Sequence, residues 1–125
     1  MIVFVGDSPS PRMKPGARPF EGAACEKRLY RWIYSVLPAM YGANWEYPAF
    51  KIYNSTDEDI TYYLGHAISG YDVKFVALGN NATNFLKKFN VSHFKLPHPS
   101  GRNRQVNNEE FIQERLKACK EWLNA

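Results

Sequence analysis

Apolar residues along the chain gather in short runs that are separated by segments with helical spacing. Runs of about four to eight apolar residues between turn signals are typical of buried β-strands. The third run is the most continuous and contains a single lysine, which is typical of a central strand in a parallel sheet. The four predicted strands are residues 1–5, 49–53, 73–78 and 91–96.

The segments between the strands carry apolar residues at about every third or fourth position, the spacing of one helical face. The first helix is predicted over residues 23–40 and the last over residues 108–123. The inward-facing side chains predicted for these two helices are Leu29, Trp32, Ile33, Val36, Leu37 and Met40, then Ile112, Leu116, Cys119 and Leu123.

Two shorter helices are predicted in the middle of the chain. Ser55 and Glu58 have capping-box spacing, so the second helix is expected to start there and to end at Gly70. Asn81, after a turn at Gly79, is expected to cap a third helix that runs through Phe89. The apolar face predicted for the second helix is Ile60, Tyr63, Leu64, Ala67 and Ile68.

This alternation of strands and helices predicts a fold of the α/β class. It indicates a single domain over residues 1–125, with a four-stranded parallel sheet in a three-layer α/β/α arrangement. Sites in such sheets form beyond the carboxyl ends of the strands. The two most unusual loops, residues 7–21 and 97–107, each follow a strand, so we expect them to converge on one edge of the sheet.

Composition narrows the class of protein. Hydrophobic residues make up 45% of the chain, which argues against a disordered protein. The net charge of +4 weakly favours a polyanionic partner such as nucleic acid. No apolar run approaches the roughly 20 residues of a membrane span, and no secretory signal is recognised, so we expect a cytoplasmic protein that does not bind membranes. We also expect a monomer. Cys25 and Cys119 lack metal-ligand spacing and are expected to be buried thiols, with no metal and no cofactor.

Two residues stand out as candidate chemistry. Asp7 follows the first strand directly, where a carboxylate can act as a base or an electrostatic stabiliser, although an aspartate at such a junction often serves a turn. His98 lies between Pro97 and Pro99, which restrict its backbone. A histidine held in this way, in a loop with two arginines, favours a functional role.

Several motifs, taken in order along the chain, resemble those of the uracil-DNA glycosylase superfamily. Residues 6–9 (GDSP) are similar to its opening Gly-Glu-Ala-Pro motif, and residues 16–24 (GARPFEGAA) to a segment of its iron–sulfur branch. Residues 76–82 (VALGNNA) are similar to its central strand and the following helix start. Residues 98–100 (HPS) match its second active-site motif, and residues 100–104 (SGRNR) resemble the corresponding loop of the mismatch-specific branch.

The resemblance implies a uracil-DNA glycosylase-like fold and a base pocket. By position, Asp7 would stabilise the cationic sugar or position water, and His98 would hydrogen-bond the base carbonyl O2. Phe20 would stack on the flipped base and Asn54 would read the uracil edge, with Ser8 beside them in the base pocket. Because cleavage produces an oxocarbenium-like sugar and an anionic base, a carboxylate and a hydrogen-bond donor at these positions suit the reaction.

The same resemblance implies contacts with single-stranded or duplex DNA. Arg102 would occupy the position of the residue that wedges into the duplex, and phosphates would be held on both sides of the target. The residues predicted to contact DNA are Arg18, Ser100, Gly101, Arg102 and Arg104, with Lys14 and Lys95 as further cations.

The chain departs from the family pattern in two informative places. It has two cysteines where iron–sulfur members have four, which argues against a cluster. Ser10 stands where the best-known uracil enzymes have a tyrosine that excludes the thymine methyl group, so 5-substituted uracils are admitted as substrates.

Structural roles remain open for several of these residues. Asn54 can cap the helix near Ser55, Phe20 can anchor the core, and Arg102 and Arg104 can be solvated charges. The aromatic cluster from Tyr30 to Tyr47 is interpreted as packing and not as a base-stacking platform.

Three functions therefore remain open on sequence alone. The first is a DNA glycosylase that acts on uracil or a related base. The second is a catalytically inactive glycosylase-fold module that binds DNA, a nucleotide or a protein. The third is an enzyme that acts on free nucleosides or nucleotides.

Overall fold

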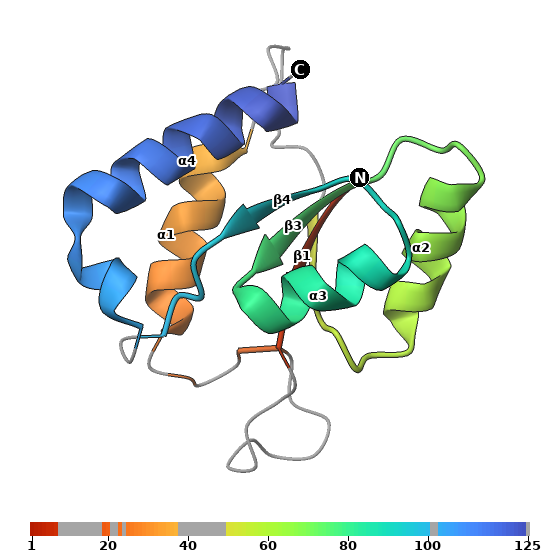
Figure 1. Cartoon of the computed structure of the whole chain (residues 1–125), viewed down its shortest axis with the longest axis horizontal. Helices are drawn as coiled ribbons and strands as arrows, with labels where there is room; N and C mark the ends of the chain where they lie inside the picture. Colours follow the sequence, from red (N-terminus) through yellow and green to blue (C-terminus); the bar gives the residue numbers. More distant parts are fainter. Residues whose placement is uncertain (8–18, 21–22, 24, 38–49, 101–102, 125) are drawn as a thin grey trace, which may run out of the picture.

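The fold is known from a computed structural model, which describes residues 1–7, 19–20, 23, 25–37, 50–100 and 103–124. The described strands form one four-stranded parallel sheet with the order β2-β1-β3-β4 (Figure 1). Its elements are β1 (Ile2–Gly6), α1 (Glu26–Val36), β2 (Phe50–Asn54), α2 (Asp59–Ile68), β3 (Lys74–Leu78), α3 (Asn80–Lys88), β4 (His93–Leu96), the 3₁₀ helix η1 (Arg104–Asn107) and α4 (Glu109–Asn124). The predicted α/β class with a four-stranded parallel sheet is confirmed.

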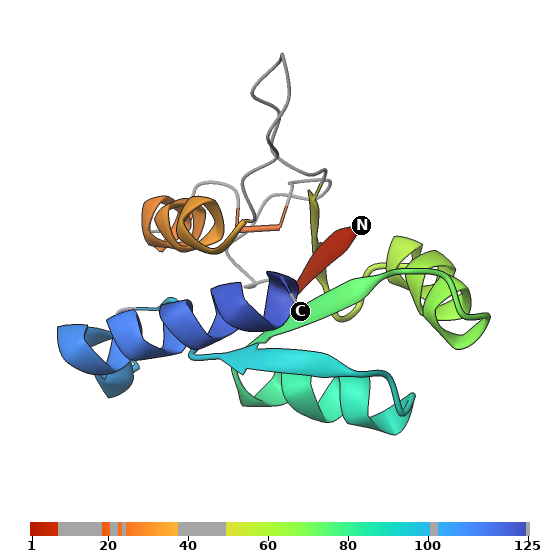
Figure 2. The same ribbon diagram turned by 90° about the horizontal axis from the view of Figure 1, so that it is seen from above.

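The helices form a layer on each face of the sheet (Figure 2). Phe4 and Val76 project into a core that α1 and α4 complete. Val3, Val5 and Phe75 project to the opposite face, where α2 and α3 cover them. Successive side chains on a strand point to opposite faces, so both central strands are buried on both sides and read as continuous apolar runs.

The predicted helix faces are confirmed wherever the structure describes them, with one exception. Leu29, Trp32, Ile33, Val36 and Leu37 of the first predicted face are buried, and so are the four predicted inward residues of α4; Met40 lies outside the described residues. Ile68, the last residue of α2, was expected to face inward but is 68% exposed.

Two predicted helix caps are wrong. α2 begins at Asp59 and not at Ser55, and Glu58 at its N-cap makes no side-chain capping bond. The preceding chain forms a turn instead, in which the Asp57 carboxylate accepts the Asn54 backbone N–H at 2.7 Å. Asn81 does not cap α3, because Gly79 occupies the N-cap with a φ of 94° that favours glycine.

Further boundaries also differ from the prediction. α1 begins at Glu26 and ends at Val36, because Leu37 has an extended backbone; a proline follows Leu37 in the sequence and disfavours the helical conformation there. The loop predicted over residues 97–107 contains the 3₁₀ helix η1.

Among the described residues, no helix is both long and apolar enough to span a membrane.

The cysteines differ in their surroundings. Cys119 is fully buried, and burial raises the pKa of its thiol to about 12. Cys25 is only partly buried, so the expectation of two buried thiols holds for Cys119 alone; desolvation still raises the pKa of Cys25. Both thiols are free.

Candidate functional site

The carboxyl ends of the four strands lie at one edge of the sheet and carry the candidate site. Gly6 at the end of β1 is in register with Asn54 at the end of β2. The end of β3 is in register with the end of β4, so Gly79 and the loop that contains His98 follow side by side. The sheet therefore brings Asp7, Asn54 and His98 to a common edge. Convergence of the loops that contain Asp7 and His98 was predicted from their positions after strands.

Phe20 reaches this edge through a close approach to Gly6. A Cβ atom placed on Gly6 would lie 2.6 Å from Cε2 of the Phe20 ring and 3.6 Å from Oδ1 of Asn54. The ring also lies 5.8 Å, centroid to centroid, from the His98 imidazole. Phe20 has a φ of 66°, a left-handed conformation that is strained for an aromatic residue and that recurs at functional sites.

Phe20 is also part of the core. Its side chain is 9% exposed and joins the apolar cluster on the α1 and α4 face of the sheet. The structural interpretation as a core anchor is therefore correct. Its close approach to Gly6 and its ring contact with His98 place this anchor along one wall of the candidate site.

Asn54 is a buried residue at the end of β2. The residue is 7% exposed, and its backbone is held by the Asp57 turn, with Asp57 N donating to Asn54 O at 3.0 Å. No described residue hydrogen-bonds its side-chain amide, and the side chain does not cap α2. The capping alternative is therefore wrong, and the donor and the acceptor of this amide are available to a ligand.

His98 has a defined proton position. The Ser100 backbone N–H donates to His98 Nδ1 at 3.1 Å, so in the neutral ring the proton is on Nε2. Burial lowers the pKa of His98 below 6.5, and the negative charge of Asp7 opposes that shift without cancelling it. The imidazole is therefore neutral at pH 7 and presents an Nε2–H donor.

The backbone around His98 is held by partners that the sequence did not indicate. Arg28 of α1 donates from Nη1 to the Pro99 carbonyl at 2.8 Å. The Asn103 side chain donates to the His98 carbonyl at 3.2 Å and accepts from the Gln105 backbone N–H at 3.1 Å. An asparagine before a polar turn is a known cap signal, which would have identified Asn103; Arg28 has no such signal.

His98 also packs closely on Gly79. A Cβ atom on Gly79 would lie 3.0 Å from Cβ of His98, and the φ of 94° disfavours any other residue there. The turn between β3 and α3 thus forms the floor beneath the histidine.

Asp7 is linked to the same turn. The Asn81 side chain donates to Asp7 Oδ2 at 2.8 Å, and the charge of Asp7 acts on His98. Asn81 was identified in the sequence only as a helix cap, so its contact with Asp7 was missed. The carboxylate, the imidazole, the Asn54 amide and the Phe20 ring therefore come from separate segments and gather at one edge of the sheet.

The predicted DNA contacts are only partly within the described residues. Ser100 is half-buried beside His98, and Arg104 is exposed on η1. Lys95 is exposed and donates from Nζ to the Asn80 side chain. Ser8, Ser10, Lys14, Arg18, Gly101 and Arg102 lie outside the described residues. Within the described ranges, no group of His, Cys, Asp and Glu side chains is arranged to hold a metal ion.

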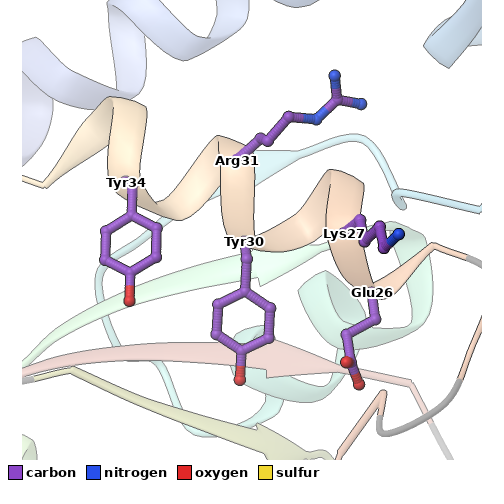
Figure 3. Close-up of a pocket in the computed structure, with 5 residues that line it drawn as sticks. All are labelled: Glu26, Lys27, Tyr30, Arg31 and Tyr34. Carbon is purple, nitrogen blue, oxygen red and sulfur yellow. The ribbon is translucent and has the colours of Figure 1, made fainter.

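A hollow lies on α1, outside the candidate site. Its described lining is Glu26, Lys27, Tyr30, Arg31 and Tyr34 (Figure 3). Tyr30 and Tyr34 point to the same side of the helix and stack, with their ring centroids 6.4 Å apart, whereas Arg31 points away from them. Tyr34 also packs edge-on against Phe50, which agrees with the interpretation of these aromatics as packing.

Comparison with known proteins gives no further guide, because no family model, no curated protein and no solved structure matches this chain.

Proposed function

We propose that this protein is a DNA glycosylase that hydrolyses the N-glycosidic bond of uracil or of a 5-substituted uracil in DNA. The observation that carries the proposal is the meeting of an ionisable carboxylate, a neutral imidazole donor and the side-chain amide of Asn54 at one edge of the sheet. The ordered resemblance of the surrounding motifs to the uracil-DNA glycosylase superfamily supports the reaction class.

Recognition of the base is assigned to Asn54 and Phe20. The Asn54 carboxamide offers one acceptor for uracil N3–H and one donor for uracil O4, whereas cytosine presents the reverse pattern at these atoms. Phe20 lies beside Asn54 across Gly6 and supplies an aromatic surface for the flipped base. This pairing of a hydrogen-bonding edge with a stacking face favours a pyrimidine that has been taken out of the helix.

Chemistry is assigned to Asp7 and His98. As the bond between the sugar C1′ and the base N1 breaks, its electron pair leaves with the base and positive charge develops on the sugar. The Asp7 carboxylate stabilises that cation, and the His98 Nε2–H donates to the anionic O2 of the departing base. Water then adds to C1′ and gives up a proton, and a proton returns to the base anion, so no co-reactant is needed.

The neutral state of His98 suits this role. Because Nδ1 accepts a backbone hydrogen bond, the ring points its single donor away from the loop without requiring protonation. Asn103 and Arg28 hold the carbonyls of His98 and of Pro99, which limits the cost of reorganisation when charge develops. DNA is favoured over a free nucleoside by the exposed Arg104, by the overall charge of +4 and by the arginines predicted to bind phosphates. We expect the protein to act as a cytoplasmic monomer.

Single- and double-stranded oligonucleotides that contain one uracil test the proposal. We expect abasic sites with wild-type protein and their loss in Asp7→Asn. We also expect uracil excision to fall in Asn54→Asp, since a carboxylate cannot donate to O4. Glu114→Gln, at an exposed position on α4, is the matched control and is expected to behave as wild type.

Other outcomes reject the proposed function or the assignment of its base pocket. DNA binding without base release would favour the inactive binding module. Release from free nucleosides alone would favour the nucleoside enzyme. Wild-type excision by Asn54→Asp would show that the base pocket is misassigned.

A further inference from the structure

The first turn of α3 makes a contact that the proposed function does not use. Asn81, the second residue of the helix, donates from its side-chain Nδ2 to Asp7 Oδ2 at 2.8 Å. The two residues are 74 positions apart in the sequence. An asparagine on an exposed helix surface can satisfy its amide with water. The hydrogen bond from Asn81 to the Asp7 carboxylate is therefore a specific contact between the two side chains.

The sheet explains why the two side chains meet. β3 pairs with β1 in parallel, with Ala77 opposite Val5, so the helix that follows β3 starts beside the end of β1. Gly79 turns the chain sharply with its φ of 94°. Thr83 then donates from Oγ1 to the Gly79 carbonyl at 2.9 Å, which fixes the first turn of the helix.

The neighbouring contacts hold Asn81 in place. Asn80, directly before it, accepts a hydrogen bond from Lys95 on β4, so the start of α3 is tied to the next strand as well. Asn81 itself does not cap the helix, because the N-cap is Gly79. Its amide therefore contributes little to helix initiation and is directed to the carboxylate.

We propose that Asn81 is a positioning residue that fixes the orientation of the Asp7 carboxylate toward the sugar of the bound nucleotide. A carboxylate on a short side chain rotates about its Cβ–Cγ bond, and a donor that holds one oxygen restricts that rotation. Asn81 acts through Asp7 and is not expected to touch the base. The inference rests on the proposed glycosylase function, because it assigns Asn81 a role in the same reaction.

Steady-state excision of uracil from a single-stranded oligonucleotide tests the role of Asn81. We expect Asn81→Ala to lower kcat by about 10- to 100-fold, the order of loss that a misplaced catalytic group causes, with KM unchanged within about twofold. Asn81→Gln keeps a donor amide and is expected to recover part of kcat. Asn84→Ala is the matched control, because Asn84 is an exposed asparagine on the same helix.

Thermal unfolding of each variant separates positioning from folding. Positioning predicts similar melting temperatures for Asn81→Ala and Asn81→Gln with different kcat values. If the wild type releases uracil and Asn81→Ala is equally active, the role of Asn81 is overturned and the glycosylase proposal stands. A loss of kcat that tracks the melting temperature, with no recovery in Asn81→Gln, would also overturn it. Absence of release by the wild type would overturn both.

Discussion

Two histidines of this protein contact aromatic rings, but their surroundings differ. His66 on α2 lies edge-on to Tyr62 and Tyr71, with ring centroids 4.2 and 5.0 Å away. Those tyrosines are 64% and 67% exposed, so the cluster lies on the surface of one helix and the turn after it. His98 is half-buried and meets Phe20, Gly79, Ser100 and the charge of Asp7.

The difference shows what distinguishes a candidate site from an aromatic cluster. Ring contacts alone are present at both places, and they are closer at His66. At His98, but not at His66, polar groups from several strand ends gather, and one ring nitrogen accepts a hydrogen bond from a backbone N–H. Chemistry needs that pre-organised geometry, because polar groups already aimed at developing charge need not reorganise during the reaction.

The largest expected effect contrasts the two histidines directly. We expect His98→Ala to lower the single-turnover rate of uracil release by roughly 10²- to 10³-fold, because one donor to the developing anion is lost. His66→Ala is expected to keep the wild-type rate. Rapid-quench measurement of abasic sites checks both variants. An equal loss of rate in the two would show that His98 is no more important for the reaction than His66.

A second prediction compares two glycines. Gly6→Ala places a Cβ atom 2.6 Å from the Phe20 ring, so we expect the free energy of unfolding to fall by about 1–3 kcal/mol as the ring is displaced. A Cβ atom added to Gly65, in the exposed middle of α2, would meet nothing within 4 Å, and Gly65→Ala is expected to raise stability by about 0.5–1 kcal/mol. Urea unfolding measures both; an unchanged Gly6→Ala would show that Phe20 is not held against β1.

The smallest expected effect concerns the protonation of His98. Because burial lowers its pKa in the folded state, the folded protein binds fewer protons than the unfolded chain below pH 6.5. The free energy of unfolding should therefore decrease as the pH falls from 6.5 toward the folded pKa, and His98→Gln should lack this contribution.

Nitrogen-detected NMR titration reports the same histidine directly. We expect the proton on Nε2 at pH 7, and a further lowering of the His98 pKa in Asp7→Asn, because the Asp7 charge raises it in the wild type. A His98 pKa at or above 6.5 would contradict the burial argument.

Much of the fold could be predicted from local pattern. The apolar runs identified all four strands to within about two residues, and the predicted core faces of α1 and α4 are buried where described. Several errors lie at helix starts: α2 begins at Asp59, with Glu58 and not Ser55 at its N-cap, and Gly79 and not Asn81 is the N-cap of α3. Caps depend on one competing side chain or one dihedral angle, so periodicity does not resolve them.

The sequence by itself determined the α/β alternation and placed Asp7 and His98 on loops that follow strands, because hydrophobic period and proline restriction are local properties. Only the tertiary structure decided which groups meet there. Three contacts depend on the strand order β2-β1-β3-β4 and on close approaches at glycine. They are the hydrogen bond from Asn81 to Asp7, the hydrogen bond from Arg28 to Pro99 and the packing of the Phe20 ring on Gly6. Such contacts join distant segments, and their geometry exists only once the sheet has assembled.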